Sequence, residues 1–205
     1  MKELLPISAL NSLRDKFLRR DDHYPVNFVL DFMAPLLAGV TDESTPVCPL
    51  HGSFYDFLVD IEQSREFFIE QHHIHYDLAV TSLSAMQAGL QFNICGLENS
   101  YLCNSEVVGL ESKVEENIPP HLLNSCQFWA THIQDAEFDA DLLQQVRRFV
   151  TGLQILFWLE ALGVSKLIGE AYWALTSTEK WLQVRLFLDN VVCYPNNRLT
   201  RKKGV

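Results

Sequence analysis

The side chain of His51 could take part in binding or catalysis, because of its residue type and its position in the sequence. It lies in "PLHGSFYDFL", residues 49–58, between a proline-bounded segment and a run with helical spacing. A histidine at a helix start lies beside free backbone N–H groups, which is a favourable place for an anion. Two interpretations follow: a surface histidine at a helix start, or a contact to a bound ligand.

A second candidate is "HHIHYD", residues 72–77, which holds three histidines. At helical spacing His72 shares a face with His75. Tetrahedral zinc needs four nitrogen or sulfur ligands close together, and the chain has neither an HExxH motif nor paired CxxC motifs. Thiolates from Cys95 and Cys103 could join only if their loop folded back. We therefore expect no metal site and predict a partly exposed helix start.

Four carboxylates precede the helical run "LLQQV", and they could bind calcium or cap a helix. They are Asp135, Glu137, Asp139 and Asp141. A calcium loop of the EF-hand kind needs a glycine and a distal glutamate at set positions, and both are missing here. Carboxylates are also favourable at the positive end of a helix dipole. The pattern therefore favours helix capping.

Motifs for nucleotide hydrolysis and for catalysis are missing from the sequence. There is no GxxxxGK[ST] phosphate loop and no GxGxxG. Five cysteines and seven histidines are present, but no local signature pairs a cysteine nucleophile with a histidine. We expect no catalytic residue, no cofactor in the isolated chain, and no binding of ATP or ADP by the chain alone.

Composition limits the class of partner. The 205 residues carry a net charge of -10, which argues against nucleic acid because phosphate binding needs a basic face. The C-terminal "RLTRKKGV" is basic but short. The longest apolar run, "LQILFWLEALGV", is too short to span a bilayer and contains Glu160. An odd number of cysteines without CxxC, and no signal peptide, favour a reducing compartment, the cytoplasm.

Helical spacing dominates the first 62 residues. Leu10, Leu13, Phe17 and Leu18 form one stripe. Helical spacing then resumes through Val29, Phe32, Met33, Leu36 and Leu37, and Pro35 is expected to cause a kink or a helix restart. The turn-rich stretch from about Gly39 to Leu50 predicts a small β-hairpin. A further helix then places Phe54, Phe57, Leu58 and Ile61 on one face.

The remaining residues predict further helices. One ends near Gly89, an irregular loop follows, and a polar helix ends at Pro119 and Pro120. Next come a helix from Pro120, one long helix or two joined near Gly152, and a last helix from residue 170. We expect residues 120–188 to form one packed unit with its large aromatic side chains mostly buried: Trp129, Phe157, Trp158, Trp173 and Trp181.

The fold class predicted from these elements is all-α. Two helices, a hairpin and then "PLHGSFYDFL" follow one another in the order of a winged-helix domain, so residues 1–62 are expected to be winged-helix-like, with the hairpin as its wing. Residues 63–205 are expected to form an α-helical domain with a divergent tail from about residue 189.

Several stretches resemble one family. "GVTDESTPVCPLHGSFYDFLVD" resembles the winged-helix segment after the ATPase core in fungal NACHT proteins, which are signal-transducing STAND NTPases of the NLR-like kind, often with a WD40 propeller. "FNICGLENSYLCNSEV", "IPPHLLNSCQFWATHIQD", "LFWLEALGVSKL" and "ALTSTEKWL" are similar to the same group. The resemblance runs from about Leu5 to Leu182. It implies that the histidine in the winged helix, here His51, reaches the phosphates of bound ADP and helps hold a closed, inactive state.

The resemblance implies a non-catalytic regulatory and interaction region that packs on a nucleotide-binding domain, in cis or in trans, and contacts other proteins. The phosphate loop and the magnesium-holding strand of the family are missing, so we expect a fragment without the ATPase core. The alternative is a free-standing helical enzyme or scaffold of unrelated function, which a deep pocket with convergent polar groups would favour. A DNA-binding winged helix is disfavoured because "VNFVLDFMAPLLAGV" contains no Lys or Arg.

Overall fold

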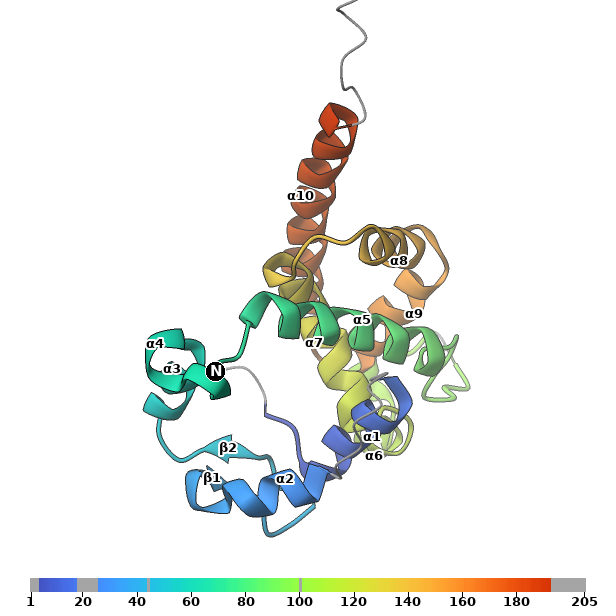
Figure 1. Cartoon of the computed structure of the whole chain (residues 1–205). Helices are drawn as coiled ribbons and strands as arrows, with labels where there is room; N and C mark the ends of the chain where they lie inside the picture. Colours follow the sequence, from blue (N-terminus) through green and yellow to red (C-terminus); the bar gives the residue numbers. More distant parts are fainter. Residues whose placement is uncertain (1–3, 18–25, 44, 100, 193–205) are drawn as a thin grey trace, which may run out of the picture.

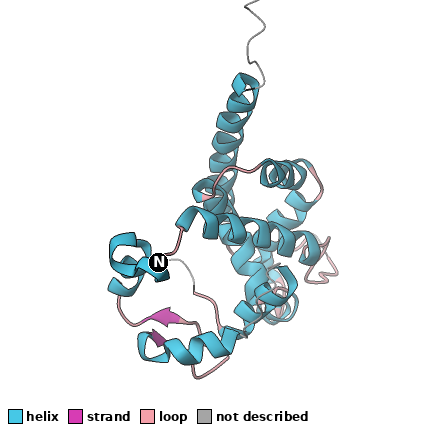
Figure 2. Ribbon diagram, in the orientation of Figure 1, coloured by secondary structure: helices cyan, strands magenta, loops and turns pink. Residues whose placement is uncertain are grey.

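The computed structural model describes residues 4–17, 26–43, 45–99 and 101–192 of the chain. These residues form ten α-helices and one antiparallel pair of two-residue strands, as Figures 1 and 2 show. The predicted mostly helical fold with a small hairpin is therefore confirmed. The expected break after the first helix falls on residues 18–25, and most of the expected divergent tail falls on residues 193–205; both lie outside the described residues.

The N-terminal part is built around the hairpin. Its elements are α1 (Ile7–Phe17), α2 (Val26–Met33), a 3₁₀ turn (Ala34–Leu36), β1 (Leu37–Ala38), β2 (Cys48–Pro49), α3 (Ser53–Val59), α4 (Ile61–Ser64) and a second 3₁₀ turn (Arg65–Phe67). In the hairpin Leu37 pairs with Pro49. Pro6 also forms an isolated bridge with Pro46, so the residues before α1 extend the pairing by one contact. Pro35 lies within the 3₁₀ turn that follows α2, so the α-helix is interrupted there, as the sequence predicts.

Gly39 makes the hairpin possible. Its φ of +79° lies in the left-handed region, where a side chain is strained, and a Cβ at this position would collide with the Pro46 carbonyl. The turn that follows β1 therefore requires glycine at residue 39. The predicted hairpin between about Gly39 and Leu50 is confirmed, although β1 begins two residues before Gly39.

The core of the N-terminal part is small. Of the residues that the structure describes, three buried ones form it, Ile7, Leu30 and Leu37, with partly buried neighbours from α2, the hairpin and α3. The apolar stripe read from the sequence through Val29 and Phe32 does not reach this core, since the Phe32 side chain is 87% exposed. α2 has only eight residues, and the stripe that reaches the core is Val26, Leu30 and Met33. The face with Val29 and Phe32 is left in solvent.

The C-terminal part is a cluster of longer helices. They are α5 (Gln71–Gly89), α6 (Leu110–Asn117), α7 (Pro120–Asp135), α8 (Ala140–Thr151), α9 (Gln154–Val164) and α10 (Ile168–Val192). The predicted ends near Gly89 and before Pro119 are confirmed, and α8 and α9 are two helices separated at Gly152. α5 packs along α7, and close approach at Gly89 brings the Leu122 methyl group within 2.9 Å of where a Cβ would lie.

Three aromatic rings occupy the centre of this core. Trp129 lies edge-on to Phe149 and to Trp158, with ring centroids 4.9 Å and 5.8 Å apart. Edge-to-face pairs of this kind add stability beyond their buried area. The Trp158 indole N–H donates a 2.8 Å hydrogen bond to the carbonyl oxygen of Cys126, so α9 is joined to α7 by a buried polar contact.

The aromatic prediction is correct in part. Trp129, Trp158 and Trp181 are buried and Phe157 is partly buried, but Trp173 is 45% exposed, so its predicted burial is wrong. α10 directs another stripe to the core: Ala171, Ala174, Thr178 and Trp181. Polar and apolar residues are spread around α10 without a clear stripe, so its sequence does not mark which face is buried. Figure 1 shows the C-terminal half of α10 extending beyond the other helices.

Trp158→Ala is expected to destabilise the helical part strongly. Truncation of a buried Trp costs about 3–5 kcal/mol, and for a chain of this size the Tm should fall by about 6–20 °C. The matched control is Trp173→Ala, which removes the same side chain from a half-exposed site and should change the Tm little. Circular dichroism melts of both variants make the comparison. Equal shifts in the two variants would contradict this description of the core.

Candidate functional site

His51 lies on the surface, two residues before α3. Its Nδ1 accepts a 3.1 Å hydrogen bond from the Ser53 backbone N–H and lies 2.8 Å from the Ser53 hydroxyl. Because Nδ1 accepts that N–H, a neutral ring carries its proton on Nε2, which is then available to donate to an anion. The predicted position at a helix start is confirmed. The predicted nucleotide contact stays a prediction.

The ring borders a shallow hollow of about 360 Å³ between the end of α2, the hairpin and α3. Its lining is mainly apolar: Pro35, Leu36, Leu50, His51, Ser53, Phe54 and Phe57. α2 also exposes apolar side chains, including Phe28 and Phe32. Among the described residues that line the hollow, His51 is therefore the one ionisable side chain, and it lies beside apolar side chains.

The "HHIHYD" stretch opens α5 and binds it to the end of α7. His72 Nδ1 lies 2.7 Å from the Asp135 carbonyl oxygen, and His75 Nδ1 lies 3.1 Å from His132 Nδ1. The Tyr76 hydroxyl donates to the Asp139 carboxylate at 3.3 Å. In the part of the chain that the structure describes, no three His, Cys, Asp or Glu side chains gather as metal ligands. These side chains hold two helices together.

The acidic stretch caps α8. The Asp139 carboxylate accepts hydrogen bonds from the backbone N–H groups of Asp141 at 2.8 Å and Leu142 at 3.0 Å. The capping prediction is therefore confirmed for Asp139. Burial and the carboxylates of Asp139 and Asp141 raise the pKa of Tyr76, in that order. The Tyr76 phenol is therefore neutral at ordinary pH and can donate a hydrogen bond, but it cannot serve as a base.

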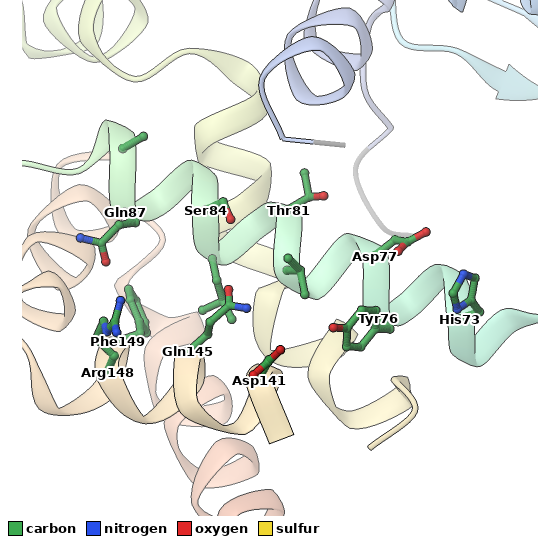
Figure 3. Close-up of a pocket in the computed structure, with 13 residues that line it drawn as sticks. His73, Tyr76, Asp77, Thr81, Ser84, Gln87, Asp141, Gln145, Arg148 and Phe149 are labelled. Carbon is green, nitrogen blue, oxygen red and sulfur yellow. The ribbon is translucent and has the colours of Figure 1, made fainter. Parts of the chain in front are cut away.

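A larger groove of about 770 Å³ runs between α5 and α8. Figure 3 shows Arg148, Phe149 and Gln87 towards one end, with His73 and Asp77 towards the other. Its lining mixes apolar side chains, including Val80, Leu83 and Phe149, with polar side chains and charges of both signs, so the groove suits a ligand of mixed polarity. Sequence reasoning missed the groove because its two walls are far apart in the chain and carry no common motif.

The two buried thiols, Cys95 and Cys126, are not suited to act as nucleophiles. Burial raises the pKa of the Cys126 thiol to about 12, and burial together with the Glu160 carboxylate raises the pKa of Cys95. Both thiols therefore stay protonated at neutral pH, whereas a nucleophile must be a thiolate. Glu160 has a structural role, since its two oxygens accept the backbone N–H groups of Asn93 and Ile94, each at 3.1 Å.

Comparisons of this chain with protein-family models, with curated proteins and with solved structures found no match. Within the described residues, none of the helices has the length and apolar character that crossing a membrane requires. The site must therefore be interpreted from its own geometry.

Asp139→Ala is expected to destabilise the start of α8. Loss of an N-cap carboxylate costs about 1 kcal/mol, or about 2–4 °C in Tm for a chain of this size. Glu137→Ala is the matched control, because the Glu137 side chain is exposed and it is the backbone N–H of Glu137 that bonds to the His72 carbonyl. In thermal melts at pH 7 the Tm of Asp139→Ala should be lower than that of Glu137→Ala. A Tm for Asp139→Ala equal to that of the control would show that the cap contributes nothing.

Proposed function

We propose that this chain is a non-catalytic regulatory and interaction region of a NACHT-type STAND signalling NTPase, from the part that follows the ATPase core. Residues 1–62 are the winged-helix-like domain and residues 63–205 the helical domain. Support comes from the family-like stretches in both parts, and from the order of helices, hairpin and helix start around His51. The protein acts in the cytoplasm and contacts other proteins.

The exposed His51 ring carries the proposal. Ser53 engages Nδ1 and leaves the Nε2–H for an anion, and the apolar surface of the hollow and α2 is of the kind that a protein partner covers. A nucleotide-binding domain seated on that surface would bring its ADP phosphates to His51. Within the chain, Phe54 and Phe57 are partly buried and anchor α3, so the ring is held without being part of the core.

The α5–α8 groove favours the alternative, a free-standing helical enzyme or scaffold. Its size and mixed lining suit a ligand. A catalytic role is weakened by the chemistry of its walls, because Tyr76 is held neutral and no cysteine lines the groove. The groove therefore supports binding better than it supports catalysis.

The test is ADP retention by a NACHT ATPase domain to which this chain is supplied in trans or joined in cis. A hydrogen bond from His51 to a phosphate contributes about 1.5–3 kcal/mol. His51→Ala should therefore speed ADP release roughly tenfold or more, while the Tm of the isolated chain changes little because the ring is exposed.

His73→Ala is the matched control, since it removes an exposed histidine from the other part of the chain and should leave ADP release unchanged. The isolated chain should give no calorimetric signal with ADP or with ATP and Mg²⁺ at micromolar concentrations. Equal ADP release with wild type and His51→Ala would end the phosphate-contact proposal, and binding of ATP by the isolated chain would favour the alternative.

A further inference from the structure

We propose that the groove between α5 and α8 binds an extended five-residue segment of a partner protein, with a basic residue at one end, an acidic residue at the other, and apolar residues at the second and fourth positions. The volume of the groove, about 770 Å³, is within the usual range of ligand-binding sites. His51 does not line this groove, so the inference does not rest on the phosphate contact proposed for that residue.

The two ends of the groove carry opposite charges. Figure 3 shows Asp141 and Asp77 towards one end and Arg148 towards the other. The side chains of Asp141 and Arg148 are exposed, and neither forms a hydrogen bond or ion pair within the described residues. After burial, the carboxylates around the acidic end raise the pKa of Tyr76: those of Asp139, Asp141 and Asp77. Charge complementarity therefore favours a cationic group at the acidic end and an anionic group at Arg148.

The spacing of the charges sets the length of the segment. Asp141 and Arg148 lie on one side of α8, and seven residues of an α-helix rise about 10.5 Å. An extended chain advances about 3.4 Å per residue and directs every second side chain to the same side. Residues four positions apart are therefore on one side and about 14 Å apart, and long side chains can bend inwards to reach both charges.

Apolar side chains from both helices lie between the charged ends. Leu83 and Phe149 are buried, Val80 is partly buried, and all three line the groove. In an extended segment the second and fourth side chains point to the side opposite the charged ones. Apolar residues at these two positions can therefore contact the apolar lining, and removal of their surface from water contributes to affinity.

Two polar side chains favour an extended backbone over a helical one. In Figure 3 Gln145 lies between Asp141 and Arg148 on α8, with Ser84 across from it on α5. Both are partly buried, and neither side chain forms a hydrogen bond within the described residues. An amide can donate to and accept from the backbone of an extended chain. A helix has already paired its own backbone groups, so it would leave Gln145 and Ser84 without partners.

The test is an amide NMR titration of the full chain with three pentapeptides, acetylated and amidated so that their side chains alone carry charge. The sequences are Lys-Val-Ser-Val-Glu, Lys-Val-Ser-Val-Lys and Glu-Val-Ser-Val-Glu. The mixed-charge peptide should bind about fivefold or more tightly than the other two, since each of those meets a like charge at one end. The shifts should lie in α5 and α8. Equal affinities, shifts in other helices, or no binding at millimolar concentrations would overturn the proposal.

Arg148→Glu should reverse this preference, because both ends of the groove are then acidic and the doubly basic peptide becomes the tightest. Arg147→Glu is the matched control, since it makes the same charge change at an exposed neighbour that does not line the groove, and it should keep the wild-type order. The wild-type order in Arg148→Glu, or a reversal in Arg147→Glu, would contradict the site. If Arg148→Glu does not fold, Arg148→Ala decides, and it should bind the mixed-charge and doubly basic peptides equally.

Gln145→Leu tests the contact to an extended backbone separately from the charges. It removes the amide and keeps much of the side-chain volume, so all three peptides should bind about twofold to tenfold more weakly with their order unchanged. Gln144→Leu is the matched control, because Gln144 is exposed and does not line the groove. Unchanged affinities in Gln145→Leu, or an equal loss in Gln144→Leu, would overturn the extended form of the segment.

Discussion

Packing of α7 against its neighbours is the constraint on which the rest of the structure depends. α7 lies along α5, receives the Trp158 indole N–H at the Cys126 carbonyl, and carries Trp129 at the centre of the aromatic core. Around it the side chains are closely packed, so changes in volume or polarity cannot be absorbed locally. α1 also contacts α5 and α7, and so ties the N-terminal part to this centre.

The two parts of the molecule differ in how they are stabilised. The C-terminal helices share a large continuous core, while the described residues of the N-terminal part form a small core around Ile7, Leu30 and Leu37 and a hairpin of two-residue strands. A small core of this kind leaves apolar side chains such as Phe28 and Phe32 in solvent. Exposed apolar side chains lower the stability of the N-terminal part, but they also make its surface suited to binding a protein partner. His51 lies beside this exposed surface.

Local signals in the sequence predicted the boundaries of the helices well. Pro35, Gly89, Pro119 and Gly152 interrupt helices where their backbone chemistry requires it, and Asp139 caps α8. The position of His51 at a helix start was also predictable. Faces were harder to predict where a helix is short, as in α2, or where polar and apolar residues are spread around it, as in α10, because the periodicity then does not indicate which face is buried.

Contacts between distant residues could not be predicted. His75 and His132 are 57 residues apart, and their bond depends on the register of α5 against α7, which no local pattern encodes. The groove between α5 and α8 arises in the same way, from two walls that the fold brings together. The hollow beside His51 likewise needs the hairpin and the end of α2 to meet α3.

Native-state hydrogen exchange tests the central claim most directly, that the helices around α7 form the stable unit and the N-terminal part opens separately. Amides of α7 from Leu122 to Ile133 should exchange slowest, through global unfolding alone, while those of α2 and α3 should exchange faster through local opening. Protection of α2 and α3 equal to that of α7 would contradict the account, because the two parts would then unfold as one.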